Sequence, residues 1–146
     1  MSFRIPQNLD ELAAALREKD ENTYLCAGGT DLVIHLRKEK KFHYSLIDLT
    51  HLPELSQITE TEDSVIIGAG VTMTELEQSP LVRTWIPALS KAASMVGSTQ
   101  IRNRATLGGN VANASQSSDT TPVLLAYGAE AEILDGTGAV TKRLVD

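Results

Sequence analysis

RNRATLGGNVANASQSSD, residues 102–119, is the stretch of this sequence least like ordinary core or ordinary surface. Its glycine pair, Gly108 and Gly109, lets the backbone approach a ligand closely, because no Cβ stands in the way of the N–H groups. The hydroxyl, amide and carboxylate side chains from Asn110 to Asp119 supply many hydrogen-bonding partners in a short segment. By itself the pattern fits either a surface turn or a loop that binds a phosphate or a polyhydroxylated chain.

A second glycine pair occurs near the start of the chain. Residues 24–27 are apolar, predict a short buried strand, and run directly into Gly28, Gly29, Thr30, Asp31 and Leu32. A strand, a glycine-rich turn and a short helix together present backbone N–H groups to a phosphate. Two such segments in one small domain are enough to hold the two phosphates of a dinucleotide.

These segments carry a family resemblance that extends over essentially the whole chain. AGGTDL (27–32), IGAGVTMTELE (67–77), IRNRATLGGN (101–110) and SSD (117–119) resemble the FAD-binding subunit of the molybdenum hydroxylases. That family includes the flavin subunits or domains of xanthine dehydrogenase, carbon monoxide dehydrogenase and nicotinate dehydrogenase. Either glycine segment alone is a weak signal, whereas both in this order and at this distance are specific.

The resemblance implies an α+β chain with the two-subdomain FAD-binding fold of the vanillyl-alcohol-oxidase (PCMH) type. Residues 1–146 are then one FAD-binding domain, with a small subdomain over residues 1–53 and a larger one over residues 54–146. FAD is expected between the two subdomains.

The residues that the resemblance assigns to FAD lie in the two glycine segments and at one acid. They are Ala27, Gly28, Gly29, Thr30, Asp31, Leu32, Val33, Thr106, Gly109, Asn110 and Asp119. The glycine segments are expected on the pyrophosphate side, and Asp119 is expected to accept hydrogen bonds from the ribityl hydroxyls. Val33 stands where some members of the family have glycine.

Purely structural interpretations exist for several of these residues. An acid such as Asp119 is favoured near a helix N-terminus by about 0.3–1 kcal/mol, and Thr30 or Asp31 can cap the helix that follows the first segment. Arg102 and Arg104 can neutralise a diphosphate or simply pair with some of the 19 acids.

The resemblance also implies partners: an iron–sulfur subunit, a molybdopterin subunit, and NAD or another electron acceptor. Subunits of this family extend beyond the position of Asp146, so a C-terminal portion of the flavin subunit is a further expected partner. No catalytic residue and no metal ligand are expected in the chain, because the chemistry belongs to the flavin. The alternatives are a non-catalytic assembly module, or one part of a split flavin subunit that does not hold FAD alone. A stand-alone flavin oxidase needs a substrate domain for which 146 residues leave no room.

Composition excludes other classes of function. The net charge of −6 argues against a nucleic-acid surface, which needs a basic stripe. The single cysteine, Cys26, cannot form an internal disulfide and is predicted to be a reduced core residue of a cytoplasmic protein without a membrane anchor. His35, His43 and His51 are eight residues apart, a spacing that does not gather a metal site and predicts surface histidines.

Periodicity and capping signals predict the elements. Asn8 with Glu11, and Thr72 with Glu75, are capping boxes at helix starts. Helices are expected over 8–19, 32–41, from 73 onward, 86–97 and 123–127. Strands are expected over 24–27, 45–49, 56–60, 64–69, 129–134 and 139–145.

Overall fold

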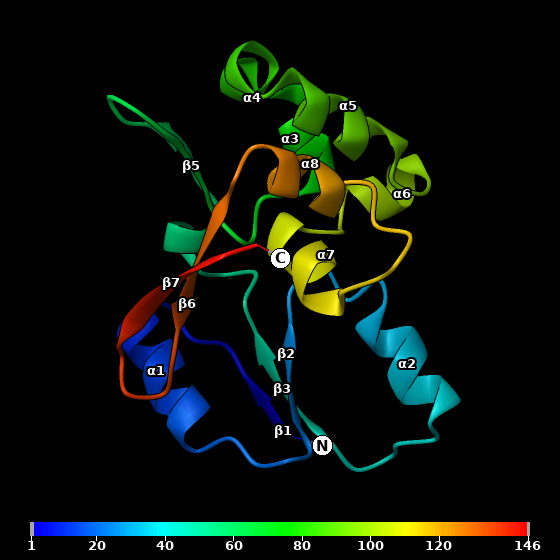
Figure 1. The fold of residues 1–146 in the computed structure, drawn as a ribbon. Helices are drawn as coiled ribbons and strands as arrows, with labels where there is room; N and C mark the ends of the chain where they lie inside the picture. The colour runs from blue at the N-terminus through cyan, green and yellow to red at the C-terminus, as the bar shows by residue number, and fades with distance from the viewer. Residues whose placement is uncertain (1, 146) are drawn as a thin grey trace.

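Three short parallel strands form a sheet from the N-terminal third of the chain, in a computed structural model that describes residues 2–145 (Figure 1). Strand β3 (Ser45–Asp48) lies in the centre, between β1 (Ser2–Arg4) and β2 (Thr23–Cys26). Helix α1 (Leu9–Arg17) packs on this sheet, with Leu12 and Ala15 in one cluster with the fully buried Ile47 of β3. The central strand therefore supplies the core of this part of the molecule.

A group of short helices forms the second hydrophobic cluster. Helices α3 (Met73–Gln78), α4 (Pro80–Trp85) and α5 (Pro87–Met95) pack together and bury Met73, Leu76, Val82, Leu89 and Ala93 completely. The capping box of Thr72 and Glu75 starts α3, as predicted. Three more helices complete the group: α6 (Thr99–Arg102), α7 (Leu107–Asn113) and α8 (Thr121–Ala126).

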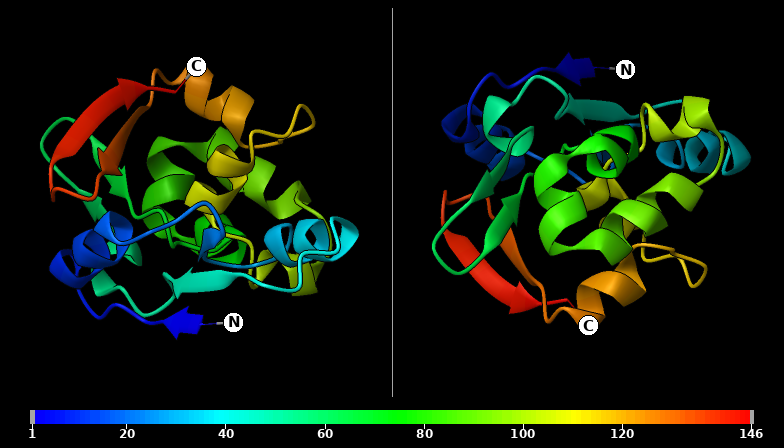
Figure 2. Two further views of the ribbon diagram at one scale, coloured as in Figure 1. Left: turned by 90° about the horizontal axis from the view of Figure 1, so that it is seen from below. Right: turned by 90° about the horizontal axis from the view of Figure 1, so that it is seen from above.

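Two antiparallel hairpins lie along the same side of the molecule (Figure 2). The first, β4 (Ile58–Glu60) with β5 (Val65–Ile67), follows the 3-10 turn η1 (Pro53–Leu55). The second, β6 (Glu130–Leu134) with β7 (Val140–Leu144), docks on α1, where Arg17 Nε donates to the Gly136 carbonyl at 3.1 Å. The C-terminal hairpin thus returns to the N-terminal helix.

The α+β class predicted from the sequence is confirmed. Helix α1 begins after Asn8, whose side chain accepts from the Glu11 N–H, although the Glu11 carboxylate accepts from the N–H of Gln7 instead of that of Asn8. Helix α2 (Leu32–Lys38) ends three residues before the predicted boundary. Strand β1, the turn η1 and the helices α4 and α6 were not anticipated, because none is longer than six residues and each carries too little periodicity to be recognised.

The strand predicted at residues 24–27 is present as β2, but the prediction that it is buried is wrong. Strand β2 lies at the edge of the sheet, and Leu25 is 43% exposed. Cys26 is half-buried and not a core residue. The physical reason is the strand order, since the central position, with neighbours on both sides, belongs to β3.

No helix within residues 2–145 is long and apolar enough to cross a lipid bilayer. The three histidines are exposed.

Candidate functional site

The first glycine segment is the turn between β2 and α2. Gly29 has φ +72°, a left-handed conformation that favours glycine. Asp31 occupies the N-cap position of α2 without a side-chain capping bond, so the structural interpretation of this acid as a cap is not supported. Within the described chain, the N–H groups of residues 28–32 donate to no protein acceptor. This turn therefore presents a run of unused donors, which suits an anionic ligand.

The second glycine segment is the first turn of helix α7, and not a loop. Thr106 is the N-cap, and its buried side chain accepts from the Gly109 N–H at 3.2 Å. The N–H groups of Leu107 and Gly108 donate to the carbonyls of Val71 and Ala69, each at 2.9 Å. The donors at the start of α7 are thus used inside the chain, and what this segment offers a ligand is the exposed backbone of Gly109 and the side chains around it.

The two glycine segments are in direct contact. A Cβ on Gly28 would lie 2.0 Å from the carbonyl oxygen of Arg104, so any side chain there would push the segments apart. A Cβ on Gly108 would lie 2.6 Å from the Ala69 Cβ, so this glycine is required where α7 packs against residues 68–70. In Figure 1 the end of β2 lies beneath α7, as these contacts require. The fold therefore joins the two segments that the sequence singled out into one surface.

Asp119 lies in the segment that connects α7 to α8, and it is exposed. Its two neighbours in the chain are fixed by one acceptor: the Asn110 Oδ1 accepts from Ser118 Oγ and from Thr120 Oγ1, both at 2.6 Å. Thr120 is completely buried. The Asp119 carboxylate is consequently presented to solvent from an anchored backbone.

The two arginines of the motif have different surroundings. Arg102 is held by the structure: its Nη1 donates to the carbonyls of Val96 and Gly97, and its Nε lies 3.5 Å from the Glu77 carboxylate. Arg104 is exposed and makes no ion pair with the residues that the structure describes. Arg104 is therefore the cation available beside the first glycine segment.

The Cys26 thiol lies at the end of β2, next to this junction. Burial raises the pKa of this thiol, the Asp48 carboxylate raises it further, and the Arg104 guanidinium opposes both. The contact of Gly28 with the Arg104 backbone places this arginine beside the β2 end of the first segment.

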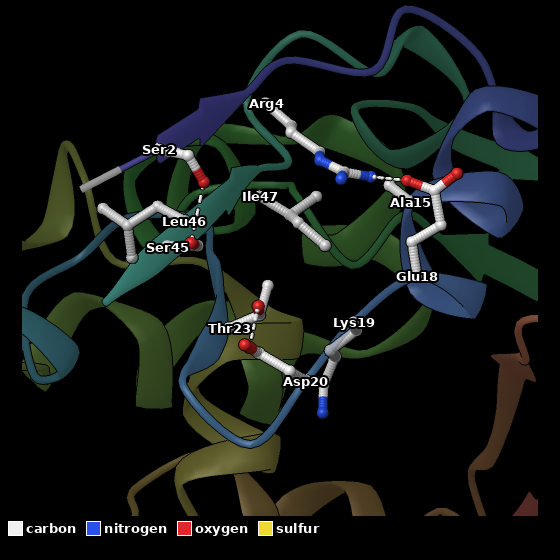
Figure 3. Close-up of a pocket in the computed structure, with 10 residues that line it drawn as sticks. All are labelled: Ser2, Arg4, Ala15, Glu18, Lys19, Asp20, Thr23, Ser45, Leu46 and Ile47. Atoms are coloured by element: carbon white, nitrogen blue, oxygen red, sulfur yellow. Dashed lines mark hydrogen bonds and ion pairs between the residues drawn. The ribbon is translucent and has the colours of Figure 1, made fainter. Parts of the chain in front are cut away.

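A separate hollow of about 130 Å³ lies at the amino ends of the parallel strands (Figure 3). Its polar side chains pair with one another: Arg4 Nη1 donates to the Glu18 carboxylate at 2.6 Å, and Ser2 Oγ donates to Ser45 Oγ at 2.7 Å. It is at the opposite end of β2 from Gly28. This hollow takes no part in the predicted site.

The structure gathers the predicted residues into a site of two parts, the β2–α2 turn and the start of α7 with its following segment. Sequence reasoning missed the roles of Ser118 and Thr120, and it left Arg104 unassigned. The sequence does place a hydroxyl residue on each side of Asp119, and this pattern could have indicated Ser118 and Thr120. Within residues 2–145 no group of three or more His, Cys, Asp or Glu side chains is placed to hold a metal ion.

Comparison with known proteins agrees with this arrangement. The whole chain, residues 1–146, matches the family described as the FAD binding domain in molybdopterin dehydrogenase. The chain belongs to this family. The resemblance stated from the sequence is confirmed, and so is FAD as the cofactor of the family.

Several relatives are named as subunits of dehydrogenases. The nicotinate dehydrogenase FAD-subunit of Eubacterium barkeri is 37% identical over 145 residues, which are 99% of this chain and 49% of that protein. A putative xanthine dehydrogenase FAD-binding subunit of Escherichia coli K12 is 41% identical over 110 residues, 75% of this chain and 38% of that one. The chain thus spans about half the length, or less, of these relatives.

Solved structures of a dehydrogenase and of an oxidoreductase share the fold. A chain of carbon monoxide dehydrogenase from Hydrogenophaga pseudoflava matches with a TM-score of 0.90 and 30% identity, and a chain of quinoline 2-oxidoreductase from Pseudomonas putida 86 with 0.92 and 29%. Each match covers 99% of this chain and 50% of the other. Nearly the whole of this chain therefore shares the fold of half of each of these solved chains.

Proposed function

We propose that this chain holds FAD as part of the flavin subunit of a molybdenum hydroxylase. The observation that carries the proposal is the contact of Gly28 with Arg104, which joins the unused N–H groups of residues 28–32 to the exposed turn at Gly109. An anion-binding turn beside a surface of amide and hydroxyl groups suits a diphosphate that continues into a polyhydroxylated chain. The residues present therefore fit FAD.

In this proposal the first segment, Ala27–Val33, binds the pyrophosphate through its backbone donors. Arg104 adds a positive charge beside it. Thr106 shapes the first turn of α7, so that Gly109 and Asn110 lie along the ligand. Asp119 accepts hydrogen bonds from the ribityl hydroxyls. When bound, FAD supplies the redox chemistry of the subunit.

The proposed fold type is the two-subdomain arrangement of vanillyl-alcohol-oxidase (PCMH) enzymes, with subdomains over residues 1–53 and 54–146. Two separate hydrophobic clusters support this division, one around Ile47 of β3 and one around Leu89 of α5. The Gly28 contact crosses between the two parts, which is where the ligand is expected.

The partners proposed for the subunit are an iron–sulfur subunit and a molybdopterin subunit. The complex delivers electrons from its iron–sulfur subunit through this subunit to NAD or another acceptor. The names of the relatives, which are subunits of dehydrogenases, support this assignment.

A second candidate is one part of a split flavin site that does not hold FAD alone. Two observations favour it: the chain spans about half of its relatives, and the donors at the start of α7 are used internally. A non-catalytic assembly module predicts the same failure to bind FAD.

Titration with FAD, FMN and riboflavin, followed by flavin fluorescence, tests the proposal. We expect FAD to bind about 10-fold or more tightly than riboflavin, because charge-assisted hydrogen bonds to backbone N–H groups contribute about 1.5–3 kcal/mol. Asp119→Asn should weaken the binding of FAD about 5-fold. The control is Asp63→Asn, at an exposed acid in the turn between β4 and β5, which should leave FAD binding unchanged. A folded chain that binds none of the three flavins contradicts the proposal and favours either the split site or the assembly module.

A further inference from the structure

One amide oxygen accepts hydrogen bonds from the residues on both sides of Asp119. Asn110 Oδ1, on α7, accepts from Ser118 Oγ and Thr120 Oγ1 at 2.6 Å each. The network continues to α8, since Ser118 Oγ lies 2.8 Å from Thr121 Oγ1 and accepts from the Thr121 N–H at 3.2 Å. The segment between the two helices is thus bound at the positions immediately before and after the acid.

These residues differ in how far they are buried. Thr120 is completely buried and Ser118 half-buried, whereas Asp119 between them is exposed. A buried hydroxyl that donates to a protein acceptor is not available to a ligand. The hydroxyls of Ser118 and Thr120 occupy both lone pairs of the Asn110 amide oxygen. That oxygen therefore cannot accept a further hydrogen bond from a ligand.

We propose that Asn110, Ser118 and Thr120 form a clamp that positions the Asp119 carboxylate toward the bound ligand. The amide oxygen of Asn110 and the hydroxyls of Ser118 and Thr120 have a positioning role, and within this network the Asp119 carboxylate is the group that contacts the ligand. The inference rests on the proposed function, because it assigns these residues to the same flavin site. Its physical content is preorganisation: a carboxylate on a fixed backbone loses less conformational freedom when it accepts hydrogen bonds from the ligand.

A double-mutant cycle tests the clamp. Thr120→Val keeps the volume of the buried side chain and removes its donor. We expect Thr120→Val and Asp119→Asn each to weaken FAD binding about 5-fold, and the double variant to bind no more weakly than Asp119→Asn alone, because the clamp acts through that carboxylate. Losses that multiply in the double variant would show that Thr120 does not act through Asp119.

Two further variants separate positioning from simple damage to the fold. Thr120→Ser retains the donor and should restore the affinity that Thr120→Val loses. Thr84→Val is the matched control, since among the described residues its hydroxyl bonds to the Pro80 carbonyl alone, within α4 at 2.8 Å. It should leave FAD affinity unchanged.

Hydrogen exchange of the chain without flavin gives a readout that does not depend on FAD. Thr120→Val should speed amide exchange over residues 115–120 at least about 5-fold, while Thr84→Val should not. Unchanged exchange in that segment overturns the clamp, whether or not the wild-type chain binds FAD. Absence of FAD binding with accelerated exchange instead contradicts the proposed function and leaves the clamp standing as a property of the fold.

Discussion

At the scale of single residues, the glycines of this site serve different purposes. Gly28 is required by a close backbone contact, and Gly29 by its positive φ. Gly109 has neither constraint: the one close contact for a Cβ there is a side-chain atom, the Thr106 hydroxyl that caps α7, at 2.9 Å. Their positions in the sequence look alike, and only their neighbours in space distinguish them.

Gly28→Ala should destabilise the chain by about 1–3 kcal/mol, because the new Cβ meets the backbone carbonyl of Arg104 at 2.0 Å and forces the segments apart. Gly109→Ala is the comparison. Its smaller steric cost is offset by about 0.5–1 kcal/mol of improved helix propensity, so its stability should stay close to that of the wild type. Urea unfolding followed by circular dichroism measures both. Equal destabilisation by the two variants would contradict the packing role of Gly28.

At the scale of elements, strand β2 brings a thiol to the edge of the proposed site. A Cβ on Gly29 would lie 3.4 Å from the Cys26 Sγ, so the cysteine is next to the turn that carries the unused N–H groups. Because burial raises the pKa of this thiol, less of it is thiolate at a given pH than in a free cysteine.

Cys26 should therefore react more slowly with a disulfide reagent such as DTNB at pH 8 than the same cysteine in the urea-unfolded chain. The rate should continue to rise as the pH is increased above about 8.5, the usual cysteine pKa. Saturating FAD should slow the reaction further, because a ligand on residues 28–32 covers the approach to the thiol. Cys26 is the only cysteine, so the absorbance of the released thiolate reports on it alone. Equal rates with and without bound FAD would place the ligand away from this turn.

At the scale of the whole molecule, contacts between distant segments link the parts that hold the two hydrophobic clusters. Gly28 packs on Arg104, and the β6–β7 hairpin returns to α1, where Leu134 joins the N-terminal cluster. Because of these links, we expect the two clusters to unfold together.

Ile47→Ala and Leu89→Ala each remove a fully buried side chain, one from each cluster, and each should cost about 2–5 kcal/mol. Because the clusters are linked, both variants should shift one common urea transition. Fluorescence of Trp85, the only tryptophan, and circular dichroism should then report the same midpoint. Ile66→Ala, at a half-exposed side chain, is the control and should cost much less. Separate midpoints for the two probes would mean that the parts unfold independently.

Local signals were sufficient for most elements and for the family. The capping residues of α1 and α3, the two hairpins and the proline-led α5 and α8 all follow from short-range rules of helix and turn formation. Strand β2 shows where such signals fail: four apolar residues predict a buried strand, but burial depends on which strand occupies the centre of the sheet.

The sequence by itself determined the α+β class, the family, its cofactor and the two glycine segments, because these depend on residue types at fixed spacing. Tertiary structure decided how those segments are used. The N–H groups at the start of α7 donate to carbonyls of residues 69–71, whereas the N–H groups of residues 28–32 have no protein acceptor within the described chain. Tertiary structure also buried Thr120, and thereby anchored the backbone that presents Asp119. Hydrogen-bond satisfaction and burial are properties of neighbours in space, and the order of residues along the chain does not specify them.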